Sequence, residues 1–381
     1  MTQFNLKLCK AFVVLLLVVG WHDRAVAATV SDLYVASIPV KDQSEALRKR
    51  ALGQGLSEVL VKLTGSRTVL ANPALRDTIS RAQDYMLEYG YVGGTPVSDQ
   101  AGVAADSTAA VGSDILEIRF AAAPIDALLR QFGLPIWPAD RPAVLVWLVA
   151  STAHGFQLVD LNENMMLAAS TEAALKRRGL PFEIPLYDLQ DQMAVVPQQD
   201  WALAEEQLSQ ASQRYGVGRW LVLQIADMGT GQVDGGQVRG SWILSGESIA
   251  DRLSGNVSAT SLPELVNSSI DQAVDQFAAP LTYRAGQLGE AIHLVVGNVD
   301  SFRVFTAVTA LFDGLEVVDS TRIVSVEGDQ LYIDVIAESD PEILIRALEK
   351  NPQMARVVDV AGSDVSGQTP YQFQWLSVGQ R

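Results

Sequence analysis

The sequence predicts an α+β protein made of serial small mixed α/β modules, the last with the β-α-β-β-α-β order of ferredoxin-like folds. Short apolar runs alternate along the chain with segments of helical periodicity, and Gly or Pro stops most of these segments. Residues 331–335 alternate between apolar and polar, as in a strand with one solvated side. We expect modules at residues 28–136, 137–289 and 290–381, preceded by a leader at residues 1–27.

In the first module, a strand ending at Val40 is followed by a helical pattern. Asp42 and Glu45 form a capping-box pattern, which predicts that the helix begins at Asp42. Gly65 predicts its end, because Gly readily adopts the left-handed conformation that follows many helices. Residues 93–113 are rich in Gly, Ala, Ser and Asp without periodicity, and they predict a loop.

In the middle module, residues 143–150 and 220–226 are nearly continuous apolar runs, typical of strands buried on both faces. Between them lie helical patterns over 164–178 and from Asp200 onward. A long helix is predicted to begin at Ser261. This order predicts a mixed sheet with helices packed on it.

The third module shows the split βαβ order most clearly. A strand near residue 292 is followed by an apolar-faced helix, two strands, a helix beginning at Asp340, and a final strand near residue 355. Beyond it, Tyr371, Phe373 and Trp375 alternate with polar residues, which predicts an edge strand or a docking segment.

The N-terminus has the three parts of a secretory signal. Lys7 and Lys10 precede an apolar run over 11–21, and Ala-Val-Ala at 25–27 is a cleavage pattern. We therefore expect export to the periplasm; the alternative is an uncleaved anchor helix, although the run is short for a membrane span. The single cysteine, Cys9, precedes the apolar run, so a lipoprotein signal is disfavoured.

Charge limits the classes of partner. Without residues 1–27 the chain keeps 25 basic and 43 acidic residues, a net charge of −18 against −16 for the full chain. Nucleic acid is disfavoured as a partner, because binding to phosphate backbones depends on clustered Lys and Arg. After the leader, no apolar run is long enough to cross a membrane.

Two stretches carry a resemblance to a known family: VASIPVKDQSEALRKRALGQGLSEVLVKLTG and the junction RQFGLPIWPADRPAVLVWLV. They resemble an uncharacterised family of exported Gram-negative bacterial proteins, the domain of unknown function family 2066. The resemblance implies a location in the cell envelope. It implies no activity and no catalytic residues.

No motif points to a cofactor, a metal or nucleophilic catalysis, and we assign no catalytic residue. Histidine is scarce: His154 is expected in a loop and His293 on an apolar strand. A calcium loop at 227–236 is disfavoured because Gly occupies two of the ligand positions; a turn between antiparallel strands explains it better.

Glu183, Asp188 and Asp191 form the densest acidic cluster. Paired carboxylates can perform acid–base chemistry when their environments separate their pKa values. The cluster therefore supports one alternative function, a carboxylate-based hydrolase or carbohydrate-binding enzyme of the periplasm. The polar surroundings favour a solvated face instead.

The junction between the first two modules contains Trp137, Arg141 and Trp147. Trp and Arg are enriched where proteins bind one another, so these residues are candidates for partner binding. The other interpretation, which we favour, is a plug packed between two modules. Together these observations predict a non-enzymatic binding or scaffold component of the cell envelope, with a protein partner there.

Overall fold

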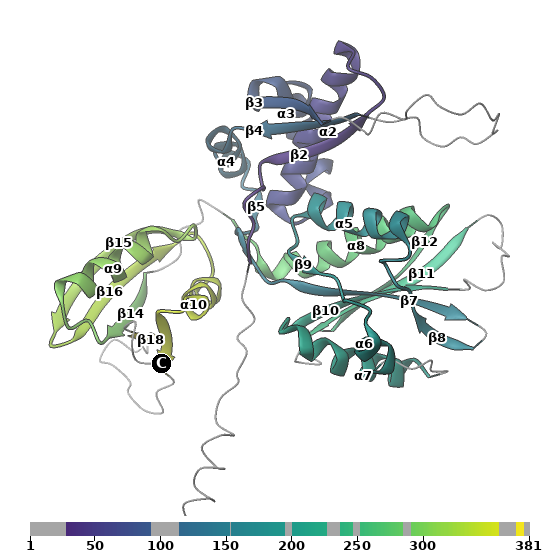
Figure 1. The fold of residues 1–381 in the computed structure, drawn as a ribbon. Helices are drawn as coiled ribbons and strands as arrows, with labels where there is room; N and C mark the ends of the chain where they lie inside the picture. The colour runs from purple at the N-terminus through teal and green to yellow at the C-terminus, as the bar shows by residue number, and fades with distance from the viewer. Residues whose placement is uncertain are drawn as a thin grey trace, which may run out of the picture.

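The computed structural model describes residues 28–92, 114–152, 154–194, 200–226, 237–246, 252–284, 291–357 and 371–376. The leader expected at 1–27, the loop expected at 93–113 and the turn expected at 227–236 lie outside the described residues. The described chain contains helices together with antiparallel and mixed sheets, so the predicted α+β class is confirmed. Three hydrophobic cores follow one another along the sequence. Figure 1 shows the helices and strands that surround them.

The N-terminal core lies under a three-stranded antiparallel sheet of order β2-β4-β3. Its elements are β2 (Val35–Val40), α2 (Glu45–Thr64), α3 (Ala74–Ser80), β3 (Met86–Val92), β4 (Asp114–Phe120) and α4 (Ala122–Gln131). Alternate residues of β2 and β4 are buried, as their period predicts, and they pack with α2.

Helix α2 begins later than the capping-box pattern predicted. Its N-cap is Ser44, and the Asp42 carboxylate accepts a hydrogen bond from the Ser44 N–H at 2.8 Å in a turn before the helix. The prediction of a start at Asp42 was therefore wrong, because Asp side chains also form local turns. The predicted end is right: Gly65 follows α2 with a φ of 69°.

The middle core surrounds a mixed sheet of order β12-β11-β10-β7-β8, in which β9 also pairs with β7. Its strands are β7 (Val144–Thr152), β8 (Gly155–Leu158), β9 (Phe182–Glu183), β10 (Arg219–Ile225), β11 (Val238–Gly246) and β12 (Leu253–Ala259). Its helices are α5 (Met165–Arg178), α6 (Leu189–Ala194), α7 (Trp201–Ser212) and α8 (Leu262–Ala278).

The two apolar runs predicted as buried strands are β7 and β10, and they are parallel neighbours in this sheet. Helices α5 and α8 cover one face, and α6 and α7 cover the other (Figure 1). Burial on both faces explains why these strands are continuously apolar. Asp200 and Ser261 cap α7 and α8 as predicted, each side chain accepting a backbone N–H.

The C-terminal core has the predicted β-α-β-β-α-β order. The elements are β14 (Ile292–Gly297), α9 (Phe302–Asp313), β15 (Val318–Glu327), β16 (Gln330–Ala337), α10 (Pro341–Lys350) and β17 (Met354–Val357). A further strand, β18 (Tyr371–Trp375), follows them.

Strand β18 is an interior strand, and the expectation of an edge strand or docking segment was wrong. The sheet order is β15-β16-β14-β18-β17, with β18 parallel to β14 and antiparallel to β17. Phe373 and Trp375 are buried in the core. The strand therefore separates β14 from β17, which would be neighbours in a four-stranded sheet of this type.

Short segments connect the cores. Strand β1 (Ala28–Thr29) pairs with β6 (Asp140–Arg141), and β5 (Pro135–Ile136) pairs with β13 (Tyr283–Arg284). The Arg130 guanidinium on α4 contacts the buried carboxylate of Glu338, with Nη1 to Oε2 at 2.7 Å. The segment 135–141 thus lies where all three cores meet.

Candidate functional site

Arg141 organises the junction between the first two cores. The residue has no exposed surface. Its Nη2 donates to the carbonyls of Lys62 at 2.9 Å and Trp137 at 3.1 Å, its Nη1 to Gly179 at 2.7 Å, and its Nε to Pro138 at 3.0 Å. Lys62 is in the last turn of α2 and Gly179 follows α5, so the guanidinium faces the negative ends of two helix dipoles. Burial lowers its pKa to about 9, which leaves it charged at neutral pH.

A second buried arginine, Arg178, joins the same helix ends. Its Nη2 donates to the Gly65 carbonyl at 2.8 Å and to Asp275 Oδ1 at 2.7 Å, and its Nη1 donates to Asp271 Oδ1 at 3.2 Å. Arg67 also contacts Asp275, at 2.7 Å. The end of α2 is therefore attached to α8 through charge-assisted hydrogen bonds, the strong class of hydrogen bond.

Trp137 fills the space between these groups. Its backbone N–H donates to the Leu63 carbonyl at 2.7 Å. The centre of its ring lies 3.9 Å from the Arg141 guanidinium, and the ring is edge-on to Phe277. Gly65 is required beside it, because a Cβ there would lie 2.5 Å from Ala278 and 3.2 Å from the Trp137 ring. Trp137 is only 2% exposed, so its position is that of a plug.

Trp147 lies in the middle core on β7 rather than at the junction. Its Nε1 donates to Ser212 Oγ at 2.9 Å, and its ring packs edge-on against Tyr187 and Tyr215. The structure thus presents none of Trp137, Arg141 and Trp147 as an exposed anchor, because each is buried and engaged with its own chain. Partner binding through them stays a prediction.

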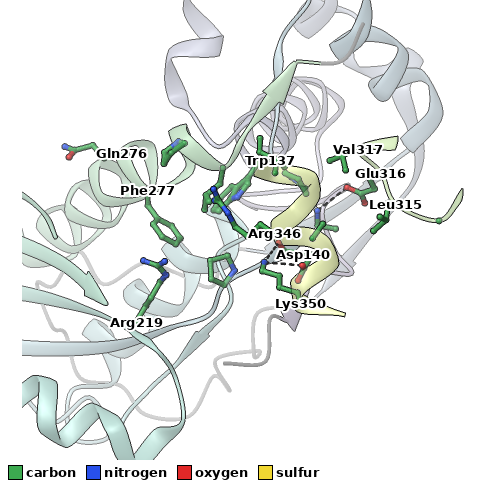
Figure 2. Close-up of a pocket in the computed structure, with 18 of the residues that line it drawn as sticks. Trp137, Asp140, Arg219, Gln276, Phe277, Leu315, Glu316, Val317, Arg346 and Lys350 are labelled. Carbon is green, nitrogen blue, oxygen red and sulfur yellow. Dashed lines mark hydrogen bonds and ion pairs between the residues drawn. The ribbon is translucent and has the colours of Figure 1, made fainter. Parts of the chain in front are cut away.

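A pocket with a volume of about 660 Å³ lies beside this junction, between the middle and C-terminal cores (Figure 2). One wall comes from β10, β12 and the end of α8, and the other comes from α10 and the segment 314–317. The segment from Trp137 to Pro142 completes it. Because segments distant from one another in the chain form it, the pocket exists only when the middle and C-terminal cores are assembled.

The pocket combines apolar and charged side chains. Phe277, Leu281, Leu315 and Ile343 supply apolar surface, and all but Phe277 are half-buried. Its charged residues are Asp140, Arg219, Glu316, Arg346 and Lys350. Most ligand sites are concave and apolar with a few placed polar groups, and their volumes run from about 300 to 1,000 Å³.

Two of the charged residues, Lys350 and Asp140, neutralise each other. The Lys350 ammonium forms an ion pair with Asp140 at 3.1 Å, and Glu316 Oε2 accepts the Ala139 N–H at 3.3 Å (Figure 2). Arg219 lies with its guanidinium 5.5 Å from the Phe277 ring centre. Arg346 has no hydrogen bond or ion pair to any part of the chain that the structure describes.

The acidic cluster holds a loop in place instead of forming an acid–base pair. Arg214 contacts both Asp188 oxygens at 2.8 Å and Asp191 Oδ1 at 2.9 Å, and Asp191 also accepts the Tyr215 hydroxyl at 2.5 Å. The hydrogen bonds from Arg214 hold the pKa of Asp188 well below its usual range, so Asp188 is unsuited to act as an acid. Glu183 is exposed on β9. Asp188 and Asp191 thus hold Arg214 and Tyr215 in place.

Two of the three histidines, His154 and His293, lie in the described ranges, on different sheets. His154 is exposed at the turn between β7 and β8, as expected of a loop residue. His293 on β14 contacts Asp334 through Nδ1 at 2.6 Å, and Arg322 contacts the same carboxylate at 2.5 Å. Burial raises the pKa of Asp334, but its hydrogen bonds to Arg322 and His293 outweigh that effect and lower it. This cluster is an ion-pair network on the sheet.

Two kinds of site are absent from the described ranges: a metal-binding cluster and a membrane-spanning helix. Within them, no group of three or more His, Cys, Asp or Glu side chains could hold a metal ion. None of the helices there is both long and apolar enough to cross a bilayer.

Sequence reasoning missed the pocket. One signal was present: Ile343, Arg346, Ala347 and Lys350 have the spacing of a single helix face, and they mix cations with apolar residues. The residues that complete the pocket come from positions as distant as Trp137 and Phe277. No local pattern connects them.

Comparison with known proteins adds a family for one part of the chain. Residues 27–138 match a family model described as a domain of unknown function (DUF8605). An uncharacterised family is thus confirmed for this part, but it is not the family 2066 that the sequence suggested. No curated protein matches.

Two solved structures resemble parts of the fold. One is a PelC dodecamer from Paraburkholderia phytofirmans, at 8% identity and a TM-score of 0.22, covering 36% of this chain and 89% of that one. The other is lipoprotein GNA1162 from Neisseria meningitidis, at 18% identity and a TM-score of 0.24, covering 36% of this chain and 98% of that one. Similarities this weak support no conclusion about function.

Proposed function

We propose that this chain is an exported, non-enzymatic binding component of a Gram-negative cell envelope, and that it binds a ligand between its middle and C-terminal cores. The observation that carries the binding role is the pocket of about 660 Å³. The leader-like segment at 1–27 supports export. A protein partner in the envelope, expected from the sequence, remains part of this proposal.

Two features support binding at the pocket. Its half-buried apolar side chains leave hydrocarbon facing the cavity, and covering that surface with a ligand is favourable. Its walls are also held in position: Lys350 on α10 is paired with Asp140, and the Tyr283 hydroxyl donates to the Glu316 carbonyl at 3.2 Å. A site with fixed walls loses less entropy when it binds.

Export and binding can be tested in one strain. The full chain is expressed in a Gram-negative host with photoreactive benzoylphenylalanine at Gln276, which lines the pocket, or at Arg76, which is exposed on α3. We expect processed protein in the periplasmic fraction and, after irradiation, an adduct detected by mass spectrometry from position 276 only. Full-length protein retained in the cytoplasm would refute export. Equal adducts from both positions, or none from 276, would refute binding at the pocket.

A further inference from the structure

We propose that the pocket binds a small amphipathic anion: one carboxylate or phosphate group on an apolar body. This inference rests on the proposed function, because it names the ligand class of the same pocket. It is carried by the distribution of charge and hydrocarbon over the two walls (Figure 2).

The charge argument begins with Arg346 on α10. Its side chain lines the pocket, is half-buried, and has no hydrogen-bonding or ionic partner anywhere in the described ranges. The neighbouring cation on the same helix face, Lys350, is already neutralised by Asp140. A guanidinium in a concave, partly apolar site recognises carboxylate or phosphate through paired N–H donors. The protein as a whole carries a net charge of −16, so this local cation is not part of a general positive field.

Arg219 supports the same ligand from the other wall. Figure 2 shows Arg219 and Arg346 on opposite sides of the pocket, with Phe277 between them in this view. Arg219 lies over the edge of the apolar wall, with its guanidinium 5.5 Å from the Phe277 ring centre. Arg219 has further contacts within the chain, so the direct acceptor of an acidic group is Arg346, with the Arg219 side chain forming part of the facing wall.

The rest of the lining selects an apolar body. Leu253 and Leu281 face the cavity from the middle core, and Leu315, Ile343 and Ala347 face it from the C-terminal core. All five are half-buried, so part of each remains available for contact. A ligand with hydrocarbon beside its acidic group covers this surface and removes it from water.

The same lining disfavours other ligands. The Glu316 carboxylate also faces the pocket, and it repels a polyanion such as a nucleic acid strand. A free inorganic anion would leave the apolar walls uncovered. A neutral amphiphile would leave Arg346 without a partner in a partly desolvated site, which is unfavourable.

The test is calorimetric titration of the purified periplasmic protein with four probes below their micellar concentrations: decanoate, decyl phosphate, decyl maltoside and inorganic phosphate. We expect decanoate or decyl phosphate, whichever acid fits, to bind at least tenfold more tightly than decyl maltoside. We expect inorganic phosphate to bind more weakly than either anionic amphiphile. The tighter of the two anions identifies the acidic group.

Three variants test separately the charge of Arg346 and the free space in the pocket. Arg346→Gln should weaken binding of the preferred anion about tenfold or more, because the anion loses a charge-assisted hydrogen bond. Arg303→Gln removes the same charge from an exposed position on α9, outside the pocket, and should leave affinity unchanged. Ala347→Trp, which fills the pocket, should abolish binding. Urea denaturation of each variant verifies that it is folded.

The outcomes distinguish this inference from the proposed function. If decyl maltoside binds as tightly as the anions, or Arg346→Gln has the same affinity as the parent, the anion assignment is wrong. In that case, a loss of binding in Ala347→Trp would still show that the ligand binds in the pocket. If no amphiphile binds, the inference fails, and the crosslinking from position 276 decides independently whether another ligand occupies the pocket.

Discussion

Replacing Arg141 with Met tests whether the buried guanidinium connects the first two cores. The substitution keeps an unbranched side chain of similar length but removes all five N–H donors. Four carbonyl oxygens within 3.1 Å lose their donor: those of Lys62, Trp137, Pro138 and Gly179. A buried polar group left unpaired costs about 1–3 kcal/mol. Water can reach some of these groups after local opening, so we expect a loss of about 4 kcal/mol, within the range for breaking buried charged contacts.

Urea denaturation monitored by Trp fluorescence measures this loss. For an m-value of about 2–3 kcal/mol/M, a loss of about 4 kcal/mol lowers the urea midpoint by about 1.3–2 M. Arg141→Lys keeps the charge but not the planar arrangement of donors, and it should lie between the parent and Arg141→Met. Arg76→Met, on the exposed side of α3, serves as the control and should leave the midpoint unchanged.

Two results would refute this reasoning. One is an Arg141→Met midpoint within about 0.3 M of the parent, since a loss of even 1 kcal/mol exceeds that shift. The other is an equal loss in the Arg76→Met control. Limited proteolysis adds a second measurement: cleavage near residue 137 should accelerate in Arg141→Met, because the segment 137–141 loses its contacts with α2 and α5.

Three further predictions concern single side chains. Burial raises the pKa of Glu58 to about 7, above its ordinary 4.5, so the folded state binds a proton more tightly than the unfolded chain, and stability falls as the pH rises from about 4.5 to 7. Between pH 5 and pH 8, Glu58→Gln should lose about 2–3 kcal/mol less unfolding free energy than the parent, as measured by urea denaturation at both pH values. An equal change with pH in parent and variant would contradict this prediction. Asp191→Ala should cost about 2 kcal/mol because Arg214 and Tyr215 lose a buried acceptor, and unchanged thermal stability would contradict it. Trp375→Ala should cost about 3–5 kcal/mol by opening a cavity in the C-terminal core; a transition like that of the parent would show that β18 is not an interior strand.

Local patterns predicted most elements of this fold. The apolar runs at 143–150 and 220–226 are the parallel strands β7 and β10, because a strand buried on both faces has no solvated side to alternate with. Asp200 and Ser261 cap their helices, since each side chain reaches an N–H that the helix leaves unpaired. Signals of this kind depend on only a few neighbouring residues, so they can be recognised in a single sequence.

Arrangements that depend on distant residues were not predictable. The alternation of Tyr371, Phe373 and Trp375 indicated a strand, but its place between β14 and β17 depends on pairing across the sheet. The role of Arg141 depends on carbonyl oxygens at the ends of α2 and α5. Every residue has a backbone carbonyl, so the sequence does not indicate which of them Arg141 contacts. The pocket could not be predicted either, because its lining comes from segments spread between Trp137 and Lys350.

The position of β18 gives the C-terminal core two ways to complete its sheet. Strand β17 is antiparallel to β18, which is parallel to β14, so β17 already has the polarity to pair with β14 directly. Direct pairing would produce the ordinary four-stranded arrangement and leave Tyr371–Trp375 displaced. Burial of Phe373 and Trp375 therefore favours the place of β18 between β14 and β17 over direct pairing of those two strands.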